Sequence, residues 1–316
     1  MNSKDTAYRV LVTGASGFIG ANVVHELVRQ GGRPQIIVRR TSRLWRLEDV
    51  IDEIDVHRVD LTNHDATAQL LRSICPQVVI HSAAYGAYPT QSDFSQMLQV
   101  NVAATKNLLE VASDAGVKLF INLGSSSEYG AKSEPMSESD VAIPDRLYGI
   151  TKLGQTHLAS LCKSRPMHAL TLRLFSVYGP FEEPGRLWPA LLLAAIRGKT
   201  FNASAPEVAR DFVWIGDVAK IITSFSTLLQ SSCSIINIAS DVQTTLDSLI
   251  LLAEKRIGRR INIDWKRERR KPWDSATWCG NTALLRSQLG DVVTTTVDEA
   301  FSLYLDWMKR YSYFYS

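Results

Sequence analysis

Short apolar runs alternate with amphipathic stretches along the first half of the chain. In the amphipathic stretches, such as Asn22–Gln30 and Gln96–Ala115, apolar positions recur with the spacing of a helix that buries one face. The apolar runs are short and are bounded by polar, glycine or proline positions, which is typical of buried strands. They predict strands over Tyr8–Thr13, Gln35–Val38, Asp55–Val59, Val78–Ala83, Leu119–Leu123 and Leu170–Leu174. Strands that alternate with helices indicate an α/β fold with a doubly wound parallel sheet.

The pattern changes after residue 180. Several prolines interrupt it, a helix is predicted over Pro189–Arg197, and an apolar strand follows at Ser234–Ala239. From residue 244 on, helices surround one predicted strand at Ile261–Trp265. We therefore predict a smaller, discontinuous α/β lobe beside the main domain. The expected division gives residues 1–180 and about 212–243 to the main domain, and 181–211 and 244–316 to the smaller lobe.

The composition excludes some classes of protein but does not indicate a function. The 316 residues are 45% hydrophobic and 21% charged, which suffices for a sizeable core. A net charge of +3 gives no argument for nucleic-acid binding. No apolar run of about 18 residues could span a membrane, and the polar N-terminus resembles no secretory signal, so we expect a soluble, cytoplasmic protein without membrane contact. Four widely separated cysteines predict reduced, buried thiols, and no metal site is expected.

Three glycines at Gly14, Gly17 and Gly20 follow the first predicted strand and open the next helix. Glycine permits positive φ and close backbone approach, and the amides at a helix N-terminus favour a pyrophosphate. This arrangement predicts the dinucleotide site of a Rossmann fold, a simple tight turn being the alternative. The residues expected to line it here are Gly14, Ser16, Gly17, Phe18, Ile19 and Gly20.

Two arginines follow the second predicted strand. An NAD site places an acid there for the ribose 2′-hydroxyl, whereas an NADP site places arginine there. Arg39 and Arg40, with the nearby Ser42 hydroxyl, suit a phosphate dianion because guanidinium groups bind phosphate bidentately. The residues therefore predict NADP(H) as the cofactor, a solvated basic loop being the alternative.

The glycine spacing resembles the extended branch of the short-chain dehydrogenase/reductase family. That family carries a tyrosine and a lysine four residues apart, as Tyr148 and Lys152 are here. On a helix the two side chains share a face, and a nearby ammonium lowers the phenol pKa from its reference value of about 10. The third catalytic group is a hydroxyl after the fifth strand, for which Ser125 is the first candidate and Ser126 the alternative.

The resemblance implies further contacts with the cofactor. Asp60 and Leu61 end the third predicted strand, where the family contacts adenine. A wall of small residues follows the fourth strand, and an asparagine lies on the next helix. The additional cofactor positions implied by the resemblance are Ser82, Ala83, Ala84, Asn101, Leu123, Tyr148, Lys152, Phe175 and Val177.

The stretch from Ser125 to Gly130 resembles the S-S-x-x-x-Y-G motif of nucleotide-sugar epimerases and reductases. The related dehydratases carry adjacent Asp and Glu after the hydroxyl, and this chain has Ser126 and Ser127 there. Dehydration is therefore not expected, although Glu128, one residue later, keeps it open as an alternative if the loop is shifted.

Motifs after residue 170 resemble the substrate side of the same branch. Arg173–Pro180 resembles R-x-F-N-x-Y-G-P with Ser176 in place of Asn, and Arg210–Val213 resembles the motif whose arginine meets the nucleotide diphosphate. Lys271 and Asp274 correspond to R-x-x-D, where lysine loses the bidentate geometry of arginine. The predicted substrate contacts are Tyr85, Ser126, Ser127, Ser176, Arg186, Arg210, Lys271 and Asp274.

These motifs predict an NADPH-dependent ketoreductase that reduces the keto group, at C4, of a nucleotide-activated deoxysugar, with Tyr148 as proton donor. A 4-epimerase with retained NAD would share every motif except Arg39–Ser42. Reduction of a non-sugar carbonyl is a further alternative, against which Arg210 and Lys271 argue. A non-catalytic NADP(H)-binding regulator is the alternative from another class, and the intact Ser125, Tyr148 and Lys152 argue against it. The family resemblance also implies a homodimer formed through the helices of Asn101 and Tyr148.

Overall fold

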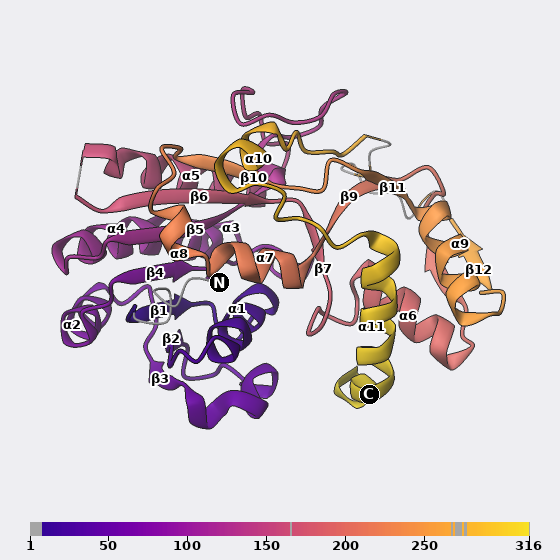
Figure 1. The fold of residues 1–316 in the computed structure, drawn as a ribbon, viewed down its shortest axis with the longest axis horizontal. Coiled ribbons are helices and arrows are strands. Elements are labelled where there is room, and N and C mark those ends of the chain that lie inside the picture. Colours follow the sequence, from indigo (N-terminus) through magenta and orange to yellow (C-terminus); the bar gives the residue numbers. More distant parts are fainter. Residues whose placement is uncertain (1–7, 165, 267, 269–273, 275–276, 316) are drawn as a thin grey trace.

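The computed structural model describes residues 8–164, 166–266, 268, 274 and 277–315. It has a large lobe built on a seven-stranded sheet and a smaller lobe beside it (Figure 1). The strand order is β10-β6-β5-β4-β1-β2-β3, and every neighbouring pair is parallel. The strands are β1 Val10–Thr13, β2 Gln35–Val38, β3 Asp55–Arg58, β4 Val78–His81, β5 Leu119–Ser125, β6 His168–Leu174 and β10 Ile235–Ile238.

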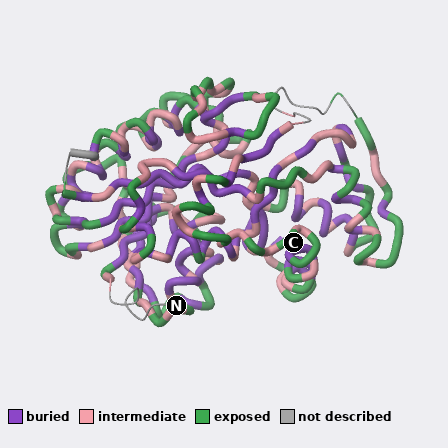
Figure 2. Tube along the Cα trace, turned by 45° about the horizontal axis from the view of Figure 1, so that its top comes forward, coloured by how far each residue is buried: buried purple, intermediate pink, exposed green. Residues whose placement is uncertain are grey.

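Helices cover both faces of this sheet, so its central strands are buried on both sides (Figure 2). That burial explains why β1 and β4 are continuous apolar runs rather than alternating ones. One face is covered by α1 Phe18–Arg29, α7 Ile215–Ile222, α8 Phe225–Leu228 and α10 Ala283–Leu289. The other face is covered by α2 His64–Ile74, α4 Ala104–Asp114 and α5 Leu147–Ser160.

The smaller lobe has its own apolar core. Tyr178 and Trp188 stack at a centroid distance of 4.0 Å, and Phe301 and Tyr304 are fully buried around them. Its elements are α6 Leu187–Arg197, α9 Leu246–Ile257, α11 Val297–Tyr311 and η7 Ser312–Tyr315, with the strands β7 Ser176–Tyr178, β8 Phe201–Ala203, β9 Ala209–Trp214, β11 Gln243–Thr245 and β12 Ile263–Trp265. We propose the division of the chain at 180, 212 and 243 as an approximate one, since Tyr178 and Phe212 near these positions pack in the core of the smaller lobe.

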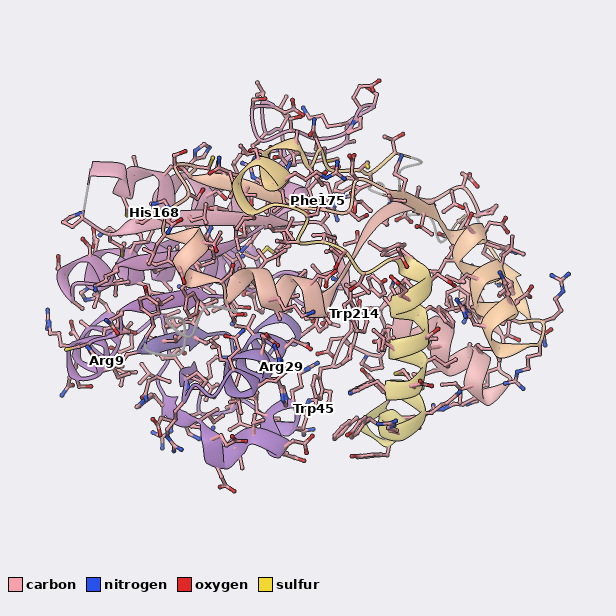
Figure 3. All side chains as sticks on the ribbon, in the orientation of Figure 1. Arg9, Arg29, Trp45, His168, Phe175 and Trp214 are labelled. Carbon is pink, nitrogen blue, oxygen red and sulfur yellow. The ribbon has the colours of Figure 1, made fainter. Side chains whose placement is uncertain are left out.

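Arg46 joins the two lobes. It lies in η2 (Trp45–Glu53) and is almost completely buried. Its guanidinium donates to the Ser16 carbonyl in the glycine-rich turn, to the Phe181 carbonyl at 2.8 Å and to Glu183 at 2.6 Å. Trp45 packs on the C-terminal segment, and Figure 3 places Trp45 and Trp214 where the lobes meet. The glycine-rich turn and the chain crossing to the smaller lobe are thus held by one side chain.

Several predicted boundaries were wrong by a few residues. β1 begins at Val10, β4 ends at His81, and β5 continues to Ser125 because its last residues still pair with β6. The predicted helix Gln96–Ala115 begins earlier and is interrupted. It consists of α3 (Phe94–Met97), a π-helical turn η3 (Leu98–Ala103) and α4. All four cysteines are free, but Cys75 is exposed, which contradicts the expected burial.

Within the described ranges, no helix is both long and apolar enough to cross a membrane.

Candidate active site

Gly14 and Gly20 bring the glycine-rich turn against the neighbouring backbone. A Cβ on Gly14 would lie 2.5 Å from the Ala83 nitrogen, and one on Gly20 would lie 2.3 Å from the Gly14 oxygen. Of these three glycines, only Gly14 has positive φ (+67°). For Gly20 the requirement is space, because any side chain would push α1 away from the strand end.

The start of α1 fits a dinucleotide pyrophosphate. Gly17 is its N-cap, no side chain caps the helix, and the first turn holds no acid. Its first amides are therefore available to an anion that the helix dipole attracts. Phe18, Ile19 and Gly20 form this first turn, and Arg46 fixes the preceding Ser16 carbonyl.

Arg39 and Arg40 are exposed just beyond β2, as an NADP site requires. The Arg39 amide donates to the Ser42 hydroxyl and the Ser42 amide donates to the Arg39 carbonyl, so the turn is closed. Arg58, which we did not predict, donates to the Arg40 carbonyl at 3.2 Å. The predicted parallel sheet could have pointed to Arg58, because Val38 at the end of β2 pairs with Arg58 at the end of β3. The two strand ends therefore share one edge of the sheet.

The predicted adenine and nicotinamide contacts lie on the same edge of the sheet. Asp60 is exposed after β3, where its carboxylate accepts from the amide and hydroxyl of Thr62, and Leu61 is half-buried. Ser82, Ala83 and Ala84 follow β4, and the Ser82 amide donates to Thr13. Leu123 in β5 and Phe175 after β6 are buried, and Val177 in β7 is half-buried.

Asn101 lies in the π-helical turn and is fully buried. Its amide oxygen accepts from the Tyr85 backbone, and its nitrogen donates to the Tyr85 carbonyl and to the Thr151 hydroxyl. These bonds tie the loop after β4 to α5. Asn101 therefore holds these two elements together, and its predicted contact with the cofactor stays a prediction.

Ser125 and Tyr148 lie on two elements that are in contact, namely the end of β5 with its following loop and the start of α5. Ser125 ends β5, and Tyr148 lies in the first turn of α5. A Cβ on Gly149 would lie 2.3 Å from the Ser127 carbonyl oxygen, so only glycine lets α5 approach this closely. The Ser125 hydroxyl oxygen accepts from the Ser127 amide, which leaves its own proton available for donation to a substrate oxygen.

Burial raises the pKa of Tyr148 to about 12, while the positive charges of Arg186 and Arg146 act in the opposite direction. The expected lowering of this pKa by Lys152 was therefore wrong for the protein alone. Burial also lowers the pKa of Lys152 to about 8, and Glu128 opposes that shift. The Lys152 ammonium donates to the Leu123 carbonyl at 2.5 Å and to the Gln155 side chain. A phenol that keeps its proton at neutral pH is suited to donate it.

Ser126, the alternative catalytic hydroxyl, is buried and already bonded. Its oxygen accepts a 3.1 Å hydrogen bond from the Trp278 indole nitrogen. Ser125 and Ser127 are half-buried. This geometry favours Ser125 as the catalytic hydroxyl and gives Ser126 the role of anchoring Trp278, a residue for which the sequence offered no local signal.

Glu128 is unavailable as a catalytic acid. It is completely buried, and one carboxylate oxygen accepts from the Arg173 guanidinium and the Thr156 hydroxyl, both at 2.8 Å. The other oxygen accepts from the Ser125 amide. The loop is therefore not shifted in the way that would place Glu128 beside a substrate, and the alternative of dehydration through Glu128 was wrong.

Three arginines lie near the candidate site, and two of them act electrostatically on Tyr148. Arg186 lies over the Tyr88 ring, and Arg210 donates to Asp274 at 2.8 Å. Arg146, which we did not predict, is the N-cap of α5 and lies 6.0 Å from the Trp278 ring. The charges of Arg146 and Arg186 both reach Tyr148. Of the other predicted substrate contacts, Tyr85 and Ser176 are half-buried, and Lys271 lies outside the described residues.

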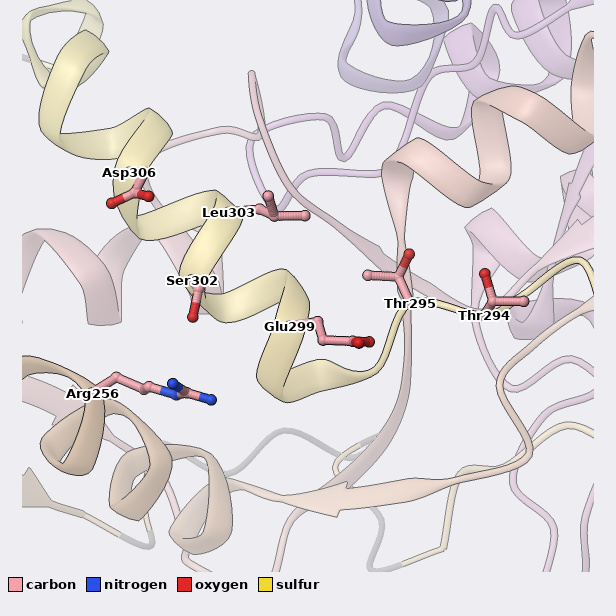
Figure 4. A pocket seen from close by; sticks show the side chains of 7 residues that line it. All are labelled: Arg256, Thr294, Thr295, Glu299, Ser302, Leu303 and Asp306. Carbon is pink, nitrogen blue, oxygen red and sulfur yellow. The ribbon is translucent and has the colours of Figure 1, made fainter.

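A groove between α9 and α11 contains none of the predicted site residues (Figure 4). Arg256 on its wall is paired with Asp298. Its lining residues are Arg256, Thr294, Thr295, Glu299, Ser302, Leu303 and Asp306. We assign no function to it.

A model of the NAD-dependent epimerase/dehydratase family matches residues 10–239, which include the glycine-rich turn, Ser125, Tyr148 and Lys152. The chain belongs to this family. UDP-glucuronate 4-epimerase 4 of Arabidopsis thaliana is 26% identical to it over 98% of this chain and 77% of the relative. The uncharacterized UDP-glucose epimerase YtcB of Bacillus subtilis is 26% identical over 81% of this chain and 84% of its own.

Among solved structures of the epimerase/dehydratase family, MoeE5 in complex with UDP-glucuronic acid and NAD is similar, with a TM-score of 0.83. It is 27% identical, and the match covers 96% of this chain and 99% of MoeE5. The predicted resemblance and the doubly wound sheet are thereby confirmed. The cofactor in that neighbour is NAD, so the comparison supports a nicotinamide dinucleotide without distinguishing the phosphorylated form for this chain.

Proposed function

We propose that this protein is a nucleotide-sugar 4-epimerase. The observation that carries the proposal is the grouping of Ser125, Tyr148 and Lys152 at the end of β5, with Glu128 withdrawn into an ion pair. Such a site moves a hydride and a proton at one carbinol carbon and has no second acid–base pair for removing water. A bound nicotinamide dinucleotide would supply the hydride acceptor.

The side chains of this protein would handle the proton and the oxygen. Tyr148 would act as its phenolate: it takes the proton of the C4 hydroxyl when the hydride leaves C4, and returns it when the hydride comes back on the opposite face. Positive charge brought by the bound cofactor would have to lower the pKa that burial raises in the protein alone. Ser125 donates a hydrogen bond to the carbonyl oxygen that forms between these steps. The positive charges of Arg186 and Arg146 favour the phenolate form of Tyr148, against the burial that raises its pKa.

A nucleotide-linked uronic acid is the substrate that the site supports best. Arg186 is exposed at the start of α6, lies 5.3 Å from the Tyr88 ring centroid, and acts electrostatically on Tyr148. A guanidinium so close to the reacting centre suits a carboxylate on the neighbouring sugar carbon. The relatives named above include a UDP-glucuronate 4-epimerase, and MoeE5 holds UDP-glucuronic acid. UDP-glucuronate is therefore the first substrate to test.

NADPH-dependent reduction of a 4-keto deoxysugar is the second candidate. It is favoured by Arg39, Arg40 and Arg58, which gather where a 2′-phosphate would lie, with no acid directly after β2. Net reduction uses the same Ser125, Tyr148 and Lys152, with Tyr148 donating its proton once. The two candidates differ in whether the reduced cofactor is consumed.

The deciding experiment measures cofactor and product together. Protein is purified without added cofactor, any dinucleotide that it retains is identified by mass spectrometry, and UDP-glucuronate is added. We expect the C4 epimer to form until equilibrium, with no net change in NAD(P)H absorbance. Stoichiometric loss of NADPH with a 4-keto-6-deoxy nucleotide sugar, and no epimer, would establish the reductase instead. Tyr148→Phe is the control, because a non-catalytic cofactor-binding regulator would behave identically with and without the phenol.

We also propose a homodimer formed through α5 and the helix of Asn101. Large apolar side chains on these adjoining helices are exposed, between 37% and 46% for Phe94, Leu98, Leu147 and Ile150. An apolar patch of this kind marks a protein interface. Light scattering is expected to give the mass of a dimer for the wild type and of a monomer for Leu98→Glu combined with Ile150→Glu. A wild-type monomer at micromolar concentration would overturn the proposal.

A further inference from the structure

Gln155 is fully buried on α5, one turn after Lys152. Its side-chain oxygen accepts a short hydrogen bond from the Lys152 ammonium. Its nitrogen donates to the Thr105 hydroxyl at 2.8 Å. None of the family motifs quoted above includes Gln155. The reaction steps proposed above do not use its side chain.

The orientation of the Gln155 amide is set by the hydrogen atoms of its neighbours. The Thr105 hydroxyl donates its single proton to the Asn101 carbonyl at 2.7 Å, so its oxygen must accept from His81 Nε2 and from Gln155. His81 is then the neutral tautomer, and its Nδ1 accepts from the Thr13 hydroxyl at 2.8 Å. Gln155 can therefore present only its oxygen to Lys152. A continuous chain of bonds runs from the end of β1 to the ammonium.

We propose that Gln155 is a positioning residue for the hydride-transfer reaction: its side-chain oxygen and the Leu123 carbonyl together hold the Lys152 ammonium at the end of β5, beside Tyr148 and the predicted nicotinamide site. The proposal rests on the proposed function for its consequence in catalysis. The placement itself follows from the hydrogen bonds. Leu123 lies in β5 and Gln155 in α5, so the two acceptors approach Lys152 from different elements.

Tyr148 shares the helix of Lys152. Among the described residues, the other charged or titratable groups that act on Lys152 are Glu128 and His81. Glu128 acts from the loop after β5 and favours the charged ammonium, although it is itself paired with Arg173. His81 acts from β4 and is neutral, because burial and the charge of Lys152 lower its pKa to about 3. The Gln155 oxygen is therefore a principal partner that keeps the buried ammonium charged.

Two substitutions at Gln155 have opposite expected effects on the pH profile. Gln155→Leu removes the acceptor, which disfavours the charged ammonium and moves its titration to lower pH. Gln155→Glu places a carboxylate there and moves it to higher pH. If Lys152 must be charged for turnover, the alkaline limb of the kcat profile shifts by roughly half a pH unit or more in each direction. We expect Gln155→Leu to lose about twofold or more in kcat at pH 8, with KM for the sugar changed less than about twofold.

Asn237→Leu is the matched control, since it removes another fully buried amide that bonds Tyr129 and the Met136 carbonyl but not Lys152. It is expected to lower stability without moving the alkaline limb. Equal profiles for all variants, or shifts of Gln155→Leu and Gln155→Glu in the same direction, would overturn the proposal.

A second measurement separates this proposal from the proposed function. The ammonium of Lys152 is followed by ¹⁵N NMR of the purified protein, with Lys152→Met to assign its signal. A lower titration midpoint in Gln155→Leu supports the positioning role even if no nucleotide sugar is epimerised, in which case only the proposed function fails. An unchanged midpoint contradicts the positioning role even in an active epimerase.

Discussion

The Glu128 carboxylate accepts a 2.8 Å hydrogen bond from the Arg173 guanidinium inside the large lobe, where the two side chains are 0% and 3% exposed. The same carboxylate accepts from the Ser125 amide at 2.8 Å. A buried ion pair between β6 and the loop after β5 therefore also fixes the backbone of the candidate catalytic serine.

Glu128→Gln is expected to lower the free energy of unfolding by about 3–5 kcal/mol, because it leaves the Arg173 charge buried without its partner. Urea denaturation at pH 7 measures this. Asp298→Asn, which breaks the exposed pair with Arg256, is the control and should change stability little. A loss at Glu128 no larger than that of the control would mean that Arg173 finds another partner.

Ser125→Ala should reduce kcat by about 10²–10³-fold, as removal of a hydrogen-bond donor to a developing oxyanion does. Ser126→Ala removes only the bond from Trp278 and should reduce kcat less than about 10-fold. Steady-state kinetics of the two variants with one nucleotide sugar decide between them. The reverse order of effects would assign catalysis to Ser126.

Combined Arg39→Ala and Arg40→Ala should weaken NADPH binding about 10- to 100-fold while leaving NADH binding nearly unchanged, because only NADPH carries the 2′-phosphate. Fluorescence titration with both cofactors measures the preference. Arg72→Ala combined with Arg310→Ala, which removes two exposed arginines from α2 and α11, controls for the change in net charge. Parallel losses for NADPH and NADH would show that the two arginines do not contact the 2′-phosphate.

Glu182 should make the protein less stable as pH rises. It is 7% exposed, one of its oxygens has no hydrogen-bond partner, and burial raises its pKa to about 8. Between about pH 4.5 and 8 the unfolded chain has lost this proton while the folded chain keeps it, so the free energy of unfolding falls as pH increases.

Glu182→Gln removes this dependence and should exceed the wild type in stability at pH 8 by an amount on the order of 2–4 kcal/mol, with no difference near pH 4. Denaturation at several pH values tests it, with Glu53→Gln, an exposed carboxylate in η2, as control. A constant difference across pH would mean that Glu182 does not keep its proton in the folded protein.

The sequence alone predicted the elements whose signal is local. Apolar runs of strand length located the strands of the large sheet to within a few residues, because a strand buried on both faces is continuously apolar. The glycine spacing located the turn before α1, and the spacing of Tyr148 and Lys152 located one face of α5, since both depend on short-range backbone geometry.

The tertiary structure decided what depends on residues distant in the chain. Glu128 became a structural group because Arg173 lies on the neighbouring strand, and Ser126 was engaged by Trp278. The pKa of Tyr148 is raised rather than lowered because burial outweighs the surrounding charges. Gln155 faces Lys152 with its oxygen because the Thr105 hydroxyl accepts from the nitrogen of the same amide. Burial and hydrogen-bond direction are properties of packed neighbours, and a one-dimensional pattern does not contain them.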